Sequence, residues 1–296
     1  MDIGDASGGP PRLLIGTHTY AAGGDAARRQ SAGIASLESI RGAQIVNVQF
    51  EHEPHQVAGI ETLAALRTTS NRLSGRAGPR KPDVAEIFAV LARAAASRGI
   101  WLFGFTNADI IFTQHAIDWM TSTSKDAFVL SRENFDPATG APRGMELSGT
   151  DVFVMTTRWW QANAHRFRSY VLAEGGFDNV YTAIMMCHAD CAIENRRPLV
   201  RHEMHPMAPM PSPHFGEYIR LLCALDAQYF RRWCTYWDGL VRLRRRGASE
   251  AEEHAWAHEA FTWNPTVRER LVQQARNIKA HVRYSTNTLR RRSSST

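Results

Sequence analysis

Asp109 is the residue of this sequence whose surroundings best suit metal chemistry. The apolar run Trp101–Phe112 is interrupted once, by Asn107 and Asp109, which lie two residues apart. If the run is a buried parallel strand, it carries the carboxylate out at its carboxyl end, where open α/β sheets bind their ligands. A buried carboxylate needs a partner. One interpretation is that Asp109 holds a divalent metal on a phosphorylated ligand, and the other is that it caps the helix expected near Thr113.

Further along the chain, basic, acidic and imidazole side chains stand at the ends of expected elements. Arg80 and Lys81 precede a helix, where they could meet a phosphate or form a solvated basic turn. Asp178 follows a Gly-Gly turn at a helix start, which suits a general base or a plain N-cap. His202 and His205 end a strand three residues apart, so they are either metal ligands or ordinary core and surface residues.

The elements that must position these side chains alternate between strands and helices. We expect strands at 12–20, 44–50, 101–112, 127–134, 148–156 and 198–206. We expect helices at 26–40, 57–67, 159–168 and 177–186, and an amphipathic helix that opens at Pro82 with an apolar face reaching Ala94. A helical region follows from Phe215 onward. Strand and helix in alternation predict an α/β fold with a mostly parallel sheet flanked by helices and a C-terminal helical appendage.

Changes in composition along the chain suggest the domain boundaries. A Pro-rich exit at 206–213 ends the last expected strand, and apolar and aromatic residues then recur at helical spacing. The predicted organisation is a disordered N-terminus at 1–11, a catalytic domain at 12–213, a helical region at 214–283 and a basic disordered tail at 284–296.

Composition places the chain among soluble proteins. Of its 296 residues, 44% are apolar and 22% charged. No apolar run approaches the roughly 20 residues of a membrane span, and the N-terminus has no signal-peptide pattern. The four cysteines match no common zinc spacing, so reduced buried thiols are preferred. A cytoplasmic location is the resulting expectation.

Positive charge is concentrated in the C-terminal part. Residues 216–296 contain 15 Lys and Arg against 8 Asp and Glu, whereas residues 1–215 contain 20 against 21. We expect Leu240–Arg246 and the tail to meet an anionic membrane surface. The alternative is a nucleic-acid-binding protein that uses these Arg-rich helices, although no recognised nucleic-acid-binding module is present.

Taken in order, these motifs resemble the nucleotide-diphospho-sugar transferases of the GT-A fold. The likeness is to a bacterial and plant group whose strand reads Phe-x-Asn-Ser/Ala-Asp-Ile, followed by segments like Gly-x-Asp-x-Phe-Val-Phe, Trp-Asp-Asn and Ile-His-x-x-His. It covers roughly Arg12 to Met210, and its most specific parts are Thr106–Ile110, Gly149–Val154 and Phe177–Val180. The resemblance implies a glycosyltransferase that uses a nucleotide-sugar donor and a divalent metal, Mn²⁺ or Mg²⁺.

In this family an Asp-x-Asp element supplies the metal carboxylate. Here Asn107 replaces the first acid, so the resemblance implies that Asp109 carries the metal and Asn107 binds ribose or a water. A second protein ligand would have to come from a distant strand, and His205 or His202 is placed to supply it.

The remaining roles that the resemblance implies concern the donor and the acceptor. Thr17 and His18 lie where this fold holds the nucleoside, and Lys81 with Arg80 would contact the diphosphate. Asp178 would be the general base on the acceptor hydroxyl.

The same resemblance implies that Asp151 orients sugar hydroxyls. The expected acceptor is a saccharide or a lipid-linked molecule.

An aromatic stripe at 218–240 is expected to form a core or a partner-binding face, such as that of a homodimer. A sugar nucleotidyltransferase is a further alternative, but Gly16–Gly24 does not match the glycine-rich loop of that class.

Overall fold

The computed structural model of the protein describes residues 12–206 and 211–262, together with residues 266, 267, 271, 272, 274, 275 and 278. The predicted N-terminal segment, most of the predicted helical region beyond residue 262 and the basic tail lie outside the described residues. The chain folds into two compact units, and each is made of several chain segments. The first unit comprises the chain up to Arg67, Ala85–Arg166 and Ala189–Pro206, and the second comprises Thr68–Val84, Phe167–His188 and the chain from Met207 onward.

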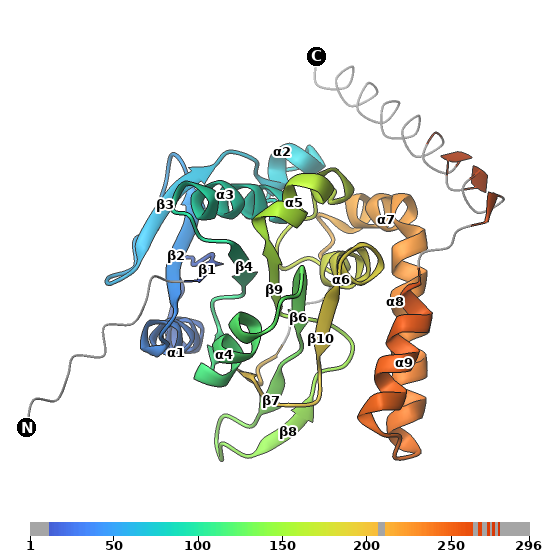
Figure 1. Cartoon of the computed structure of the whole chain (residues 1–296). Helices are drawn as coiled ribbons and strands as arrows, with labels where there is room; N and C mark the ends of the chain where they lie inside the picture. Colours follow the sequence, from blue (N-terminus) through green and yellow to red (C-terminus); the bar gives the residue numbers. More distant parts are fainter. Residues whose placement is uncertain are drawn as a thin grey trace, which may run out of the picture. The chain divides into compact units, whose positions relative to one another are not determined.

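A seven-stranded sheet forms the centre of the first unit (Figure 1). Its strands are β1 (Leu13–Thr17), β2 (Ala43–Phe50), β3 (Glu61–Leu66), β4 (Leu102–Thr106), β6 (Ala127–Leu130), β9 (Val152–Thr156) and β10 (Cys191–Glu194). They lie in the order β10-β6-β9-β4-β1-β2-β3, and only β9 runs antiparallel to its neighbours. The expected mostly parallel α/β sheet is thereby confirmed.

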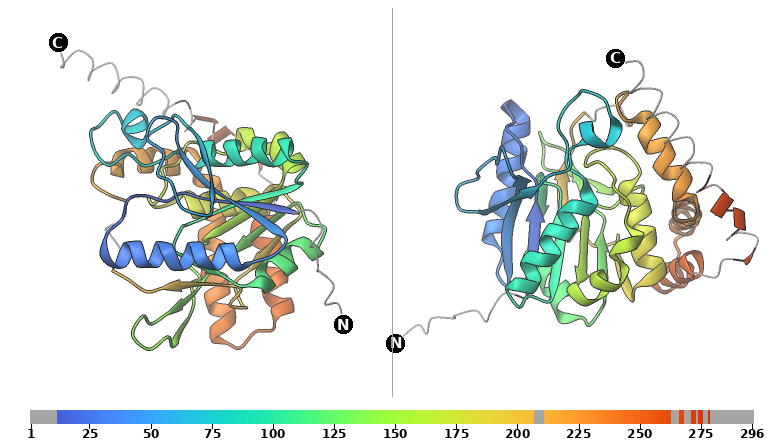
Figure 2. Two further views of the ribbon diagram at one scale, coloured as in Figure 1. Left: turned by 90° about the vertical axis from the view of Figure 1, so that its left-hand side faces the viewer. Right: turned by 90° about the horizontal axis from the view of Figure 1, so that it is seen from above.

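Helices cover both faces of this sheet. They are α1 (Gly24–Ser39), α3 (Val84–Ser97), α4 (Gln114–Ser122) and α5 (Thr157–Asn163), followed by a 3-10 turn at Ala164–Arg166. Figure 1 draws α1 and α4 below the sheet and α3 and α5 above it, and Figure 2 shows α1 and α3 from two further sides.

The alternation of side chains along each strand explains this layering. On one face, every second residue of a strand points toward α3 and α5: Phe105 of β4 and Phe153 of β9 pack on Phe88 of α3. Trp160 of α5 packs on Phe88 and on Phe103 of β4. Alternate residues on the other face form one buried cluster with α1 and α4. That cluster contains Leu13, Ile15, Leu37, Leu102, Ile110, Ile117, Met120, Phe128, Leu130, Val152 and Val154.

A smaller sheet extends the first unit beyond the end of β4. It contains β5 (Ile110–Phe112), β7 (Glu133–Phe135), β8 (Pro142–Met145) and β11 (Val200–Glu203), in the order β5-β11-β7-β8. Strand β11 runs antiparallel to β5 and parallel to β7. The chain therefore leaves the large sheet at the end of β4 and enters the small one within four residues.

The second unit is built from helices. They are α2 (Ser70–Ser74), α6 (Phe177–His188), α7 (Gly216–Leu225), α8 (Ala227–Arg245) and α9 (Glu250–Phe261). The aromatic stripe of α8 is largely buried within this unit, where Tyr236 packs on Trp233 and on Phe261 of α9. A core role for the stripe is the interpretation that this burial supports.

Three expectations about local structure were wrong. The segment 57–67 contains strand β3 and no helix, because its backbone pairs with β2 at the edge of the sheet. The run Trp101–Phe112 forms two strands in different sheets, with a turn at 107–109 between them. The expected strands do not include β10, which follows α6 after two residues.

Candidate metal centre

Asp109 lies in the short turn that connects the two sheets. The turn follows β4 at its carboxyl end, and the backbone N–H of Ile110 donates to the carbonyl of Asn107 (3.3 Å). Helix α1 presses against this turn, because a Cβ placed on Gly33 would lie 2.2 Å from the carbonyl oxygen of Ala108. Only glycine permits this close approach. Asp109 is thus held against α1 and does not cap α4, whose N-cap is Thr113.

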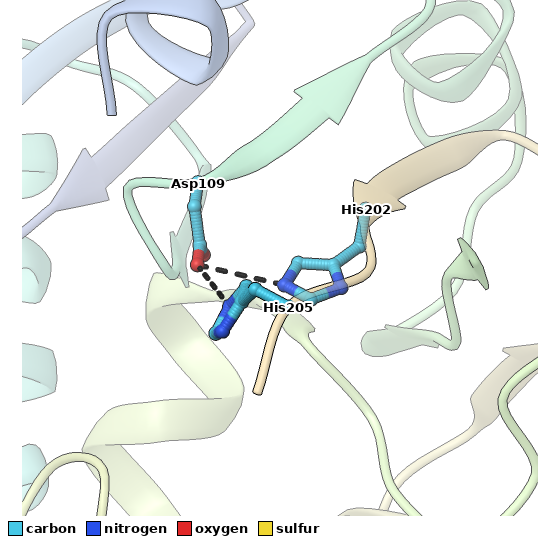
Figure 3. Close-up of side chains that lie close together, drawn as sticks. All are labelled: Asp109, His202 and His205. Atoms are coloured by element: carbon cyan, nitrogen blue, oxygen red, sulfur yellow. Dashed lines mark ion pairs between the residues drawn. The ribbon is translucent and has the colours of Figure 1, made fainter. Parts of the chain in front are cut away.

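Strand β11 and the residues that follow it bring two imidazoles to the Asp109 carboxylate. His202 lies opposite Ile110 in the β11–β5 pairing, next to the turn that carries Asp109. The Nε2 atoms of His202 and His205 lie 3.5 and 3.6 Å from Oδ2 of Asp109. Figure 3 shows both rings directed at the carboxylate. The structure therefore brings together the three residues that were predicted as metal ligands.

The other ring nitrogen of each histidine has its own acceptor. Nδ1 of His205 lies 3.0 Å from the carbonyl oxygen of Pro206, and Nδ1 of His202 lies 3.3 Å from Oδ1 of Asn134. A carbonyl oxygen can only accept, so Nδ1 of His205 carries a proton in this contact. Both rings consequently direct Nε2 toward the shared site, where it could bind a metal once it carries no proton.

Burial and charge act in opposite directions on Asp109. Its side chain is only 28% exposed, and this burial raises the pKa of the carboxyl. A hydrogen bond from His202 and the charges of His202 and His205 outweigh the burial, so the net pKa of Asp109 is lowered. The group is an anion near neutral pH, as a metal ligand must be.

The three donor atoms suit a divalent cation. All lie within 4.8 Å of one another, and ligands bound to one metal at about 2.0–2.2 Å stand roughly 3–4 Å apart. Small side-chain rotations would therefore close the site. Two imidazole nitrogens and one carboxylate oxygen suit Mn²⁺, Fe²⁺ or Zn²⁺ better than Mg²⁺, which prefers oxygen ligands. Three protein ligands leave coordination positions open for a substrate.

Asp151 lies at the start of β9, beside β4, and is almost fully buried at 5% exposure. Burial raises its pKa, while the neighbouring Arg132 and His202 act in the opposite direction. Its Oδ1 accepts a hydrogen bond from the Arg132 guanidinium. Within the described part of the chain, its Oδ2 has no hydrogen-bond partner.

Thr17 and His18 end β1, the strand next to β4 in the sheet. Thr17 is fully buried, and Nδ1 of His18 lies 2.8 Å from the carbonyl oxygen of Val48. Burial lowers the pKa of His18. Asn107 lies between β4 and Asp109 and is half-buried. All three belong to the same unit as Asp109, and their roles in donor binding stay predictions.

Lys81, Arg80 and Asp178 belong to the second unit. The ammonium of Lys81 lies 2.8 Å from Oε1 of the buried Glu174 and 5.9 Å from the ring centre of Phe215. Arg80 is exposed, and Asp178 lies in the first turn of α6. Their predicted roles in diphosphate binding and proton transfer stay predictions.

Several residues that shape the site were not identified from the sequence. Arg28 of α1 forms a two-point ion pair with Glu203, the neighbour of His202, with one N···O distance of 2.7 Å. Ser36 of α1 accepts a hydrogen bond from the N–H of Phe112 (3.0 Å). A glycine inside a helix, such as Gly33, is the one sequence signal of such a close approach.

No protein-family model and no curated protein matches the chain. Similar solved structures include two of S. aureus TarS, with TM-scores of 0.44 and 0.42 at 11% identity, covering 75% and 76% of this chain and 71% and 42% of those chains. Another is mannosyltransferase PcManGT from Pyrobaculum calidifontis in complex with GDP-Man and Mn²⁺, with a TM-score of 0.35 at 12% identity, covering 92% of this chain and 86% of that one. Likenesses this weak identify neither activity nor substrate.

Proposed function

We propose that this protein is a glycosyltransferase that moves a sugar from a nucleotide-diphosphate donor to a saccharide or lipid-linked acceptor, with a divalent metal, Mn²⁺ or Mg²⁺, as cofactor. The observation that carries this proposal is the convergence of Asp109, His202 and His205 at the carboxyl end of β4. Ligands of open, mostly parallel sheets bind at that edge. The nitrogen-containing donor set favours Mn²⁺ of the two metals.

The chemistry of the leaving group explains why such a cluster is useful. Negative charge builds on the diphosphate as the glycosidic bond breaks, and a bound divalent metal neutralises it. Asp109, His202 and His205 would hold that metal on one side, which leaves its other positions for diphosphate oxygens. Asn107 would bind the ribose or a water beside them. Thr17 and His18, at the end of the neighbouring strand, would line the nucleoside.

The remaining roles in the proposal are those of Asp178, Lys81, Arg80 and Asp151. Asp178 would accept the proton of the attacking hydroxyl, and Lys81 with Arg80 would contact the diphosphate. Lys81 could do so only in part, because Glu174 already holds its ammonium. Asp151 would orient a sugar hydroxyl through Oδ2, the oxygen that Arg132 does not occupy.

A thermal-shift experiment tests the donor and the metal together. UDP-, GDP-, CMP- and dTDP-sugars are added with and without Mn²⁺, and we expect one donor to raise Tm further when Mn²⁺ is present. In Asp109→Ala the Mn²⁺-dependent part of the shift should vanish. Asp118→Ala, which removes an exposed acid of α4, is the matched control and should keep it.

Donor hydrolysis provides a second readout. We expect release of the nucleoside diphosphate to be lost in Asp109→Ala and slowed in His205→Ala. The control His115→Ala, at an exposed histidine of α4, should hydrolyse the donor at the wild-type rate. If no nucleotide sugar stabilises the protein and Asp109→Ala changes nothing, the transferase proposal is abandoned.

A cytoplasmic enzyme acting on a lipid-linked acceptor would meet the inner face of the membrane. Among the described residues, no helix has the length and apolarity needed to cross a bilayer. We propose a peripheral contact through the arginines of α8, of which Arg242 and Arg245 are exposed. Arg244 and Arg246 pair with glutamates of α9, which reduces the charge left for a membrane or a nucleic acid. Flotation with anionic vesicles, lost in Arg242→Gln/Arg245→Gln, would support the contact.

Self-association is the last part of the proposal. Much of the aromatic stripe of α8 is buried within the chain, but Trp237 is 37% exposed and could contact a second copy. Sedimentation velocity should then show a dimer in the wild-type protein and a monomer in Trp237→Glu. A monomer in both would remove the dimer from the account.

A further inference from the structure

A row of polar side chains crosses the small sheet behind the metal centre. In the parallel pairing of β11 with β7, His202 stands opposite Asn134. In the antiparallel pairing of β11 with β5, the same His202 stands opposite Ile110, which follows Asp109. Three adjacent strands thus align Ile110, His202 and Asn134, and Asp109 directly precedes Ile110. Oδ1 of Asn134 lies 3.3 Å from Nδ1 of His202, on the side of the ring away from Asp109.

The neighbours of Asn134 determine which way its amide points. Nε of Arg132, which can only donate, gives a hydrogen bond to Oδ1 of Asn134 (3.1 Å). Nδ2 of Asn134 donates to the carboxylate of Glu146 (3.4 Å), which can only accept as an anion. In the reversed orientation, the amide NH₂ would face the donor of Arg132 and the amide oxygen would face the carboxylate of Glu146, so both hydrogen bonds would be lost. Oδ1 is therefore the atom directed at His202.

Both neighbours are themselves held in place. The Arg132 guanidinium is paired with Asp151, whose side chain is 5% exposed. The Glu146 carboxylate accepts from the backbone N–H of Ser148 (3.0 Å) and from its hydroxyl (2.6 Å). Hydrogen bonds from Ser148 and the charge of Arg132 lower the pKa of Glu146 against the effect of burial, so this acceptor is charged at neutral pH.

The backbone around Asn134 is irregular in a way that fits a positioning role. The pairing of β7 with β8 shifts register between Asn134 and Phe135, opposite Pro142 to Gly144. Gly144 adopts a φ of +94°, a left-handed conformation that side-chain-bearing residues rarely take. Bulges of this kind redirect a side chain, and they are common beside active sites.

We propose that Asn134 is a positioning residue of the metal centre, with Arg132 and Asp151 behind it. Asn134 accepts the Nδ1 proton of His202, which fixes the ring orientation and directs Nε2 at the site beside Asp109, where it would bind a cation after losing its own proton. The β7–β8 hairpin is then part of the metal centre although it supplies no ligand. This inference rests on the proposed function, because it takes the cluster to bind a cation.

The role makes two variants differ sharply. Asn134→Leu keeps the side-chain volume but cannot accept the Nδ1 proton. Loss of such an outer hydrogen bond typically weakens metal binding 10- to 100-fold, and we expect a loss of about that size for Mn²⁺ and Zn²⁺. Asn134→Asp keeps the acceptor for His202 and Arg132 but loses the donor to Glu146, so its affinity should fall less than that of Asn134→Leu. Arg143→Leu, which disturbs the same hairpin at the exposed Asp136 pair, is the control and should bind as the wild type does.

Two measurements on the full chain test the inference separately from activity. Isothermal titration with Mn²⁺ or Zn²⁺ gives the affinities. Histidine-ring ¹H–¹⁵N correlation spectra of the metal-free protein at one pH, assigned with His202→Ala, report which nitrogen of His202 is protonated. We expect Nδ1–H in the wild type and in Asn134→Asp, and a loss of this preference in Asn134→Leu.

The outcomes distinguish this inference from the proposed function. Absence of a proton on Nδ1 of His202 in the wild type, or equal affinity of Asn134→Leu and the wild type, overturns the role of Asn134 and leaves the transferase proposal standing. Asn134→Asp binding as weakly as Asn134→Leu also overturns it. If the wild type binds neither metal but shows Nδ1–H at His202, the proposal that these residues bind a cation is wrong. The hydrogen bond from His202 to Asn134 is then still supported.

Discussion

Gly33→Ala should damage the metal centre from outside it. The added Cβ would lie 2.2 Å from the carbonyl oxygen of Ala108 and 3.2 Å from Cα of Asp109, whereas ordinary contacts begin at 3.4 Å. Helix α1 is kept from moving away by two contacts, the ion pair of Arg28 with Glu203 and the hydrogen bond from the N–H of Phe112 to Ser36. The turn that carries Asp109 must therefore move by about 1 Å, five times the roughly 0.2 Å tolerance of metal–ligand distances.

Two opposing effects determine how much Gly33→Ala changes the free energy of unfolding. Overpacking a close contact costs about 1–3 kcal/mol. Replacing glycine by alanine inside a helix returns about 0.5–1 kcal/mol. The net loss should be about 1–2 kcal/mol, or a fall in Tm of roughly 2–6 °C for a chain of this size. Because Asp109 is displaced, Mn²⁺ affinity should fall at least about tenfold.

Calorimetric unfolding and isothermal titration with Mn²⁺ measure the two effects. The matched control is Gly23→Ala at the N-cap of the same helix, where an added Cβ meets no atom within 4 Å. That control should keep the wild-type metal affinity. If Gly33→Ala binds Mn²⁺ as tightly as Gly23→Ala does, the claim that α1 positions Asp109 is refuted.

Two further predictions concern charges in the fold. Lys81→Met leaves Glu174, whose side chain is 1% exposed, without its cation and should lower the free energy of unfolding in urea by about 2–3 kcal/mol. This is less than the ~3–5 kcal/mol of a fully buried pair, because the side chain of Lys81 is 29% exposed. An effect no larger than that of Lys125→Met, which removes an exposed ion pair, would contradict this prediction. The Arg143 hydrogen bond and two backbone amides lower the pKa of Asp136 to about 2, so this pair contributes stability above the unfolded pKa near 3.9 that is lost as the pH falls toward 2. An NMR titration should show this midpoint, rising in Arg143→Gln; an unchanged midpoint would count against the pairing.

Local sequence patterns were sufficient for much of the framework. The apolar runs of β1, β2 and β4 and the periodicity of α3 and α6 each contain most of the information needed to place them. The three candidate ligands, Asp109, His202 and His205, could also be predicted from the sequence. The carboxyl ends of parallel strands lie at one edge of a sheet, and the sequence places Asp109 and His202 at strand ends.

The features that failed depend on distant partners. Strand β3 contains Leu63-Ala-Ala-Leu66, residues that favour a helix, and only its pairing with β2 makes it a strand. The division of Trp101–Phe112 into two strands depends on β11, which pairs with β5. Arg28 and Glu203 lie 175 positions apart. The opposition of His202 and Asn134 likewise depends on strand register, which a single sequence does not show.

Anomalous diffraction at the manganese edge tests the central claim most directly. Crystals of the full chain are grown with Mn²⁺ and the nucleoside diphosphate that stabilises it most. We predict one strong peak about 2.0–2.3 Å from Oδ2 of Asp109 and from Nε2 of both His202 and His205, with diphosphate oxygens on its open side. A peak elsewhere, or a nucleotide bound with no metal at these three residues, would contradict the account.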